Sequence, residues 1–128
     1  MNARPYLLAI VVGLLLSISV SAKDWSGGVT TNAVWSKADS PHTWGGNMTI
    51  GTGVQLTIEP GVRVIPGPTA NLYNYGSIHA EGLPDDPIRI GALSFQAPAD
   101  TLYFFAGATN CVFRHCVFEN MSQLRVDN

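Results

Sequence analysis

The stretch that decides the fold is Val54-Gln-Leu-Thr-Ile-Glu-Pro-Gly-Val-Arg-Val64. It holds two short segments with apolar residues at alternate positions, and these segments are separated by Glu59-Pro60-Gly61. Alternation with a period of two is typical of β-strands, because successive side chains point to opposite faces. Proline and glycine mark a corner, since they do not continue a ladder of paired strands. The stretch therefore predicts a strand, a corner and a second strand.

Similar units return along the chain at a spacing of about 23 residues. Apolar pairs at positions i and i+2 fall into three interleaved series. The first series is Leu56/Ile58, Ile78/Ala80, Leu102/Phe104 and Leu124/Val126; the second is Val62/Val64, Ile88/Ile90 and Cys111/Phe113; the third is Met48/Ile50, Asn71/Tyr73, Leu93/Phe95 and Cys116/Phe118. Three strands per repeat predict an all-β solenoid, a parallel β-helix in which each coil buries its inner face against its neighbours.

The deciding stretch resembles the "LTIEPG" signature that opens many secreted and cell-surface proteins of the pectin-lyase-like superfamily. Tyr75–Gly82 followed by Pro87–Ile90 is similar to the continuation of that signature, and Trp44-Gly45-Gly46 upstream also fits. The resemblance covers about residues 42–120. It implies a right-handed parallel β-helix. It leaves the function open, because this fold hosts lyases, hydrolases, adhesins and junction proteins.

The chain divides into three predicted parts. Residues 1–22 combine one cation, an apolar run of about 14 residues and the small residues Val20-Ser21-Ala22, which is the pattern of a secretory signal peptide. A membrane span is the alternative, but it needs about 20 apolar residues. Residues 23–47 are expected to form an N-terminal cap, and residues 48–128 to form about three coils with a fourth incomplete. We expect no membrane span after the leader is removed, and a secreted, extracellular or cell-surface protein.

The predicted cap and the predicted coils end differently. Trp25, Val34 and Trp35 supply the apolar side of the cap. At the other end the fourth coil begins with Leu124/Val126, and the sequence stops two residues later. An open solenoid end leaves strand edges unpaired. The expectation is therefore a fragment truncated at its C-terminal end, or else an open edge that pairs with another protein chain.

Charge and cysteine spacing exclude some classes of function. Of seven basic side chains Arg4 lies in the predicted leader, and nine side chains are acidic, whereas a nucleic-acid-binding protein shows a basic excess. The spacings typical of metal sites are absent, so we expect no metal and no cofactor. Two alternatives remain for Cys111 and Cys116: they form a disulfide across a sharp bend at Arg114-His115, or they stay unpaired and pack as two small buried hydrophobic residues.

Four outward-facing residues are candidate ligand-binding groups. Arg63 and Arg89 are predicted neighbours on adjacent strands, where like charges repel and a bound anion relieves the repulsion. The alternative is that they extend into water or pair with Glu59 or with Asp85 and Asp86. His79 and Tyr103 are expected on one face, where they would stack on a sugar ring. The alternative is a solvated surface row.

Glu59 with Asp85 or Asp86 is the nearest approach to a catalytic pair, because glycoside hydrolysis needs two carboxylates about 5–9.5 Å apart. The alternative is that Glu59 packs a corner and that the aspartates belong to a turn. Asn47 and Asn120 begin Asn-x-Ser/Thr acceptors, which matter for glycosylation in a eukaryotic source.

Two functional hypotheses are compatible with these features of the sequence. The first is a structural, adhesion or recognition module with no catalytic residue identified, and its expected partner is an extracellular glycan or another protein chain. The alternative is a fragment of a carbohydrate-active enzyme, a polysaccharide lyase or glycoside hydrolase, that acts on acidic glycans. The first follows from the β-helix pattern without a catalytic constellation, and the second from the frequent use of this fold on polysaccharides.

Overall fold

The computed structural model describes residues 22–91, 99–104 and 107–127 of the chain. The predicted signal peptide, apart from Ala22, and the predicted pair Leu93/Phe95 lie outside these residues. Within the described part the secondary structure is almost entirely β-strand, with a single 3-10 turn, η3 (Lys37–Asp39). No helix of the described residues is long and apolar enough to cross a membrane.

The strands form three parallel sheets, and each sheet takes every third strand of the chain. Sheet A contains, in order, β1 (Lys23–Trp25), β4 (His42–Trp44), β7 (Arg63–Pro66), β10 (Ile88–Gly91) and β13 (Cys116–Glu119). Sheet B contains β2 (Gly28–Val29), β5 (Asn47–Ile50), β8 (Asn71–Asn74), β11 (Ala99–Phe104) and β14 (Met121–Val126). Sheet C contains β3 (Ala33–Trp35), β6 (Gln55–Ile58), β9 (Ser77–Glu81) and β12 (Val112–Arg114).

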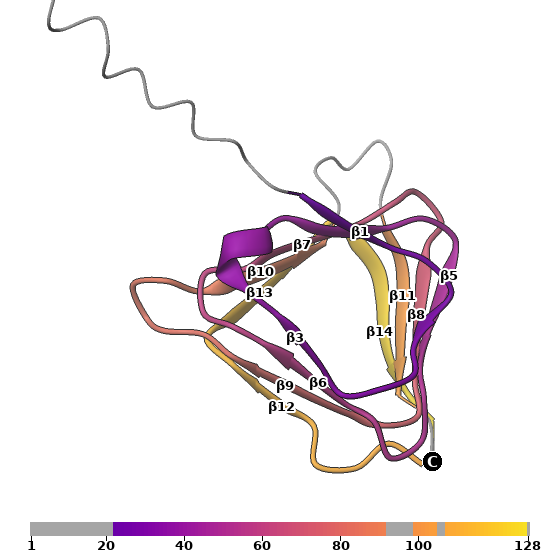
Figure 1. The fold of residues 1–128 in the computed structure, drawn as a ribbon. Coiled ribbons are helices and arrows are strands. Elements are labelled where there is room, and N and C mark those ends of the chain that lie inside the picture. The colour runs from indigo at the N-terminus through magenta and orange to yellow at the C-terminus, as the bar shows by residue number, and fades with distance from the viewer. Residues whose placement is uncertain (1–21, 92–98, 105–106, 128) are drawn as a thin grey trace, which may run out of the picture.

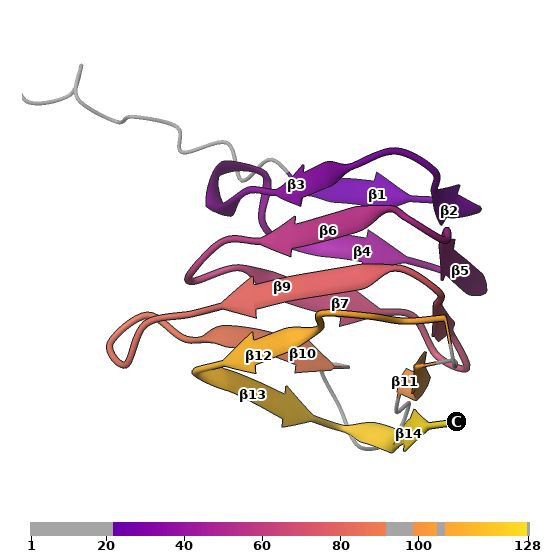
Figure 2. The same cartoon turned by 90° about the horizontal axis from the view of Figure 1, so that it is seen from below.

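The three sheets are the sides of a triangular tube (Figure 1). In that view the chain runs clockwise as it recedes from the viewer, and the coils stack one below another in the side view (Figure 2), so the solenoid is right-handed. It has about four turns of roughly 23 residues each. The predicted all-β parallel β-helix is confirmed. Residues 23–47, for which we predicted a cap, hold β1 to β4 and the first residue of β5, and β1 to β3 make a complete first coil.

Several predicted strand pairings are confirmed by the register. Leu56 aligns with Ile78, and Val64 aligns with Ile90. The pair Leu102/Phe104 aligns with Leu124/Val126. Leu56 and Ile78 lie 22 positions apart, as do Leu102 and Leu124, whereas Val64 and Ile90 lie 26 apart because the loop between β9 and β10 falls between them.

The third series is wrong in β8 by one residue. Met48 aligns with Leu72, and Ile50 aligns with Asn74, so Leu72 and Asn74 point into the core. Asn71 and Tyr73 therefore point outward. A slip of one residue moves every side chain of a strand to the other face, because side chains alternate with a period of two.

The series also lose their phase in the fourth coil. Leu102 aligns with Leu72 of β8, whereas the first series had placed it after Ile78 of β9. Cys116/Phe118 follows Ile88/Ile90, whereas the second series had placed Cys111/Phe113 there. Three segments lengthen the chain here: the loop between β9 and β10, the stretch between β10 and β11, and the stretch between β11 and β12. A fixed period of about 23 residues cannot follow a coil of different length.

Alternate positions of the strands fill the tube with aliphatic side chains. Along β6 and β9 the exposed fraction falls to 4 % or less at Leu56, Ile58, Ile78 and Ala80, while the residues between them are partly exposed. Burial of one such aliphatic side chain contributes about 1.5–3 kcal/mol. The core is therefore a column that each coil extends by one layer.

Aromatic rings close the N-terminal end of this column. The ring of Trp35 lies 5.3 Å from that of His42, nearly parallel to it, and within 5.6 and 6.1 Å of Trp25 and Trp44. His42 is fully buried. The Trp25 indole N–H donates to Nδ1 of His42 at 3.1 Å, and Nε2 of His42 lies 2.9 Å from the carbonyl oxygen of Ser36.

These two partners determine the tautomer of His42. An indole N–H only donates and a carbonyl oxygen only accepts, so Nδ1 carries the lone pair and Nε2 carries the proton. We expect nitrogen chemical shifts of the labelled protein to show the Nε2–H tautomer. His42→Phe should lower the free energy of unfolding by about 1–3 kcal/mol, because it leaves buried polar partners unsatisfied. An Nδ1–H signal would contradict this geometry.

At Gly91 the backbone of β10 lies so close to β13 that it leaves no room for a side chain. Its φ is +144°, and a Cβ atom built there would lie 1.6 Å from the backbone oxygen of Glu119. Gly91→Ala should therefore lower the free energy of unfolding by about 1–3 kcal/mol or more, because a side chain at this position strains the backbone. Gly45→Ala is the matched control, since a Cβ there meets nothing within 4 Å. Equal denaturation midpoints for the two variants would contradict the close approach.

Candidate functional site

Arg63 and Arg89 lie side by side on the outer face of sheet A, as predicted. Their surroundings differ. The guanidinium of Arg63 crosses β10 at Gly91, donates to the Gly91 carbonyl oxygen at 3.1 Å, and pairs with the carboxylate of Glu119 at 2.5 Å. Arg89 is exposed, and its side chain makes no hydrogen bond or ion pair with the described residues. Arg63 thus braces β7 against β13 across an intervening glycine, and its charge is compensated within the protein.

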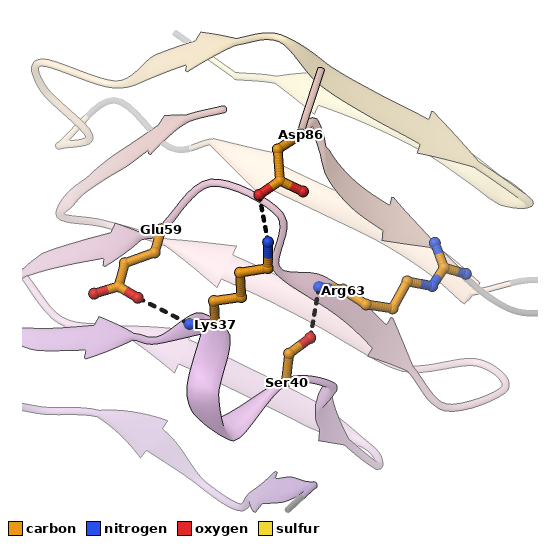
Figure 3. Close-up of polar contacts among 5 residues, drawn as sticks. All are labelled: Lys37, Ser40, Glu59, Arg63 and Asp86. Carbon is orange, nitrogen blue, oxygen red and sulfur yellow. Dashed lines mark hydrogen bonds and ion pairs between the residues drawn. The ribbon is translucent and has the colours of Figure 1, made fainter. Parts of the chain in front are cut away.

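Glu59 and Asp86 hold neighbouring corners of the solenoid together (Figure 3). Glu59 accepts a hydrogen bond from the backbone N–H of Lys37 at 2.8 Å. The Lys37 ammonium pairs with the carboxylate of Asp86 at 2.5 Å, and that carboxylate lies against Gly61, where a Cβ would approach both of its oxygens at 2.5 Å. These contacts favour the corner role of Glu59 over the catalytic one.

The corner contacts extend to Ser40, whose hydroxyl oxygen accepts from the backbone N–H of Arg63 at 2.9 Å (Figure 3). Through its ion pair with Asp86, Lys37 of the first coil contacts the loop that leads into the fourth coil. Among the described residues no group of three histidine, cysteine, aspartate or glutamate side chains is arranged to hold a metal ion.

His79 and Tyr103 do not share a face, which corrects the prediction that they do. His79 lies in β9 of sheet C, aligned with Thr57 and Val112. Tyr103 lies in β11 of sheet B. The error arose because the first series assigned Leu102/Phe104 of β11 to the same sheet as Ile78/Ala80 of β9, whereas β11 pairs with β8. The Nε2 atom of His79 is buried and has no hydrogen-bond partner among the described residues.

Tyr103 instead belongs to a row on the outer face of sheet B that we call the tyrosine row: Thr49, Tyr73, Tyr103 and Arg125. The rings of Tyr73 and Tyr103 stack with centroids 5.1 Å apart and planes 14° apart. The guanidinium carbon of Arg125 lies 5.9 Å from the centre of the Tyr103 ring. In-register parallel pairing sets equivalent side chains of successive coils one above another, so the rings meet face to face.

A second row runs beside the first, and we call it the amide row: Asn47, Asn71 and Gln123. Asn47 aligns with Asn71, and the Asn71 amide donates to the Asn47 side-chain oxygen at 3.2 Å. Gln123 is exposed on β14, aligned with Thr101 of β11. Together the tyrosine row and the amide row cover the outer face of sheet B with hydroxyl, amide and aromatic groups.

Sequence reasoning missed Tyr73 because it placed the residue inside the core. The signal was present in the chain. The β8 strand reads Asn71-Leu-Tyr-Asn74, and an apolar Leu72 offers a better inward residue than Asn71. Asn74, which follows it inward, is fully buried and accepts from the backbone N–H of Gly76 at 3.0 Å. A polar inward residue at the end of a strand thus obscured the alternation.

Cys111 and Cys116 are free thiols that pack, half-buried, against the core. The bend predicted between them exists, because His115 adopts a positive φ of 49° at the corner between β12 and β13. Burial raises the pKa of the Cys116 thiol, so this group stays protonated at neutral pH. The arrangement agrees with the alternative of two small buried hydrophobic residues. Of the two glycosylation acceptors, Asn47 is exposed, whereas Asn120 is half-buried at a corner.

The last described coil has an open edge. Leu124 on β14 is 58 % exposed, whereas Leu102, its partner one coil earlier, is 3 % exposed. Phe118 on β13 is 37 % exposed, against 5 % for its partner Ile90. These side chains occupy inward positions of the column. The two expectations for this edge, a truncated solenoid or pairing with another protein chain, stay predictions.

The two arginines of sheet A allow a matched test of their roles. Arg63→Met should lower the free energy of unfolding by about 1.5–3 kcal/mol, because it removes hydrogen bonds to a charged partner. Arg89→Met, at an exposed position, should change it by less than about 0.5 kcal/mol. Urea denaturation of the two variants measures the difference. Equal stability would mean that the Glu119 pair does not brace the coils.

Comparisons with protein-family models, with curated proteins and with solved structures found no match to this chain. The resemblance of Val54–Val64 to a signature of pectin-lyase-like proteins therefore stays a prediction. The parallel β-helix rests on the structure itself, and any function has to be argued from the surfaces that this fold presents.

Proposed function

We propose that the protein is a secreted or cell-surface recognition module that binds an extended extracellular glycan along the outer face of sheet B. The observation that carries this proposal is the stacked pair Tyr73 and Tyr103, which the register sets one above the other on adjacent coils. The amide row beside it supplies donors and acceptors. The proposed binding face is thus the tyrosine row together with the amide row.

The direction of the rows suits a polymer. Both rows run along the solenoid axis, across the strands, and they repeat with the coil spacing of about 4.8 Å. Each coil therefore offers a similar set of polar groups to the next part of a chain lying on the face. A polysaccharide, with hydroxyl groups on every unit, is complementary to such a repeated set of hydroxyl and amide groups.

The stacking also determines how the tyrosines take part. The faces of Tyr73 and Tyr103 are turned toward each other, 5.1 Å apart, so their ring edges and hydroxyl tips point away from the sheet. Contacts with a ligand are then made by hydroxyl groups and ring edges. This differs from the sequence-based expectation of a sugar ring stacked on Tyr103, although the class of ligand is the same.

The rigid scaffold favours binding. Each tyrosine is held by its neighbour and by the backbone ladder of sheet B, so little side-chain freedom remains to be lost when a ligand binds. The alternative of a carbohydrate-active enzyme gains no comparable support. Glu59 and Asp86 are used at the corners, and Arg63 braces two coils.

A pair of substitutions on two different faces tests the proposal. Tyr103→Ala should weaken binding to a polysaccharide at least tenfold, which corresponds to about 1.4 kcal/mol. Tyr103→Phe keeps the ring stack and should show a smaller loss, caused by the missing hydroxyl alone. His79→Ala, on the outer face of sheet C, is the matched control and should bind as the unchanged protein does. Affinity electrophoresis through gels containing neutral or acidic polysaccharides gives the dissociation constants.

Two results would count against the proposal. One is that no polysaccharide retards the protein. The other is that Tyr103→Ala and His79→Ala weaken binding equally, while circular dichroism shows both variants folded.

A further inference from the structure

The electrostatics of the proposed binding face point to a particular class of ligand. We infer that the glycan bound along sheet B is an uncharged one; this inference rests on the proposed function and narrows it. Arg125 is the one charged member among the described side chains of the two rows. Its Nε donates to the carboxylate of Asp127 at 2.8 Å. The charge at this end of the face is therefore balanced within the protein.

The position of Arg125 gives it a second task besides pairing with Asp127. Its guanidinium lies over the ring of Tyr103, so the cation covers the ring face that looks toward the last coil. The hydrogen bond and the negative charge of Asp127 raise the pKa of Arg125 above its ordinary value. Arg125 thus ends the aromatic stack as one half of an ion pair.

Among the side chains of this face that the structure describes, the one cation is Arg125, and it is already paired with Asp127. Recognition of a carboxylate by arginine uses two parallel hydrogen bonds from the guanidinium, and the Nε of Arg125 already donates to Asp127. A ligand carboxylate that displaced Asp127 would leave that aspartate unpaired beside a like charge. The new pair would replace the old one with no net gain.

The charges nearby do not favour a polyanion either. The whole chain has a formal net charge of −2. Arg63 and Arg89 belong to β7 and β10 of sheet A, a different side of the tube (Figure 1). The other described members of the two rows carry hydroxyl, amide or phenol groups, which suit the hydroxyl groups of a neutral sugar chain.

The test compares two soluble polysaccharides and one charge variant. The neutral probes are a mixed-linkage β-glucan and a galactomannan, and the acidic probe is polygalacturonate. The unchanged protein should bind a neutral probe with an affinity that changes little between 0.05 and 0.3 M salt, since no charge is screened. Its affinity for polygalacturonate should be at least tenfold lower.

Asp127→Asn should free the charge of Arg125 while it preserves the size of the side chain. We expect this variant to gain roughly three- to tenfold in affinity for polygalacturonate at low salt, and to lose that gain at high salt. Arg89→Gln, which removes a cation from sheet A, is the matched control and should change neither affinity.

The outcomes separate the two proposals. Binding to a neutral probe that Tyr103→Ala abolishes supports both the recognition function and the uncharged ligand. Salt-sensitive binding to polygalacturonate alone, also abolished by Tyr103→Ala, overturns the uncharged ligand and keeps the recognition function. Binding to no probe, or binding that Tyr103→Ala leaves unchanged, overturns the recognition function and this inference with it.

Discussion

The parallel, in-register pairing of each strand with the strand one coil earlier is the constraint on which the rest of this structure depends. It sets equivalent positions of successive coils one above another. Inward positions then form one continuous apolar column, and outward positions form rows that run along the tube. A row is consequently the natural unit of both stability and recognition in this protein, as the stacked rings of Tyr73 and Tyr103 show.

The same constraint explains why polar residues outside the core hold coils together over long sequence distances. Arg63 reaches Glu119 across β10 because Gly91 offers no side chain at the crossing point. Lys37 reaches Asp86 past Gly61 in a similar way. In both places a glycine of the intermediate coil makes room for an ion pair between the coils on either side. These contacts join the first four coils and the beginning of the next.

The fold could be predicted from the sequence because the alternation of apolar residues and the spacing of the repeats can be recognised along the chain. Leu56/Ile58 and Ile78/Ala80 lie on strands joined by coils of similar length, so a constant period found their pairing. It failed where a coil grew longer, since nothing in the residues of β11 says which earlier strand they will join. The inward Asn74 caused the other error, because its burial depends on a hydrogen bond to the backbone of Gly76, which an apolar pattern does not contain.

The candidate site was harder to predict than the fold for a related reason. A residue on an outer face acquires its neighbours from coils more than twenty positions away, and a shift of one residue or one strand replaces all of them. His79 and Tyr103 were separated by such a shift, and Tyr73 was hidden by another. Arg63 was placed correctly beside Arg89, yet its partner was Glu119, two coils removed from β7 in sheet A. Charged groups in a solenoid therefore have to be judged by which ones remain uncompensated after the coils have stacked, and on sheet B that criterion leaves a face of hydroxyl, amide and ring edges.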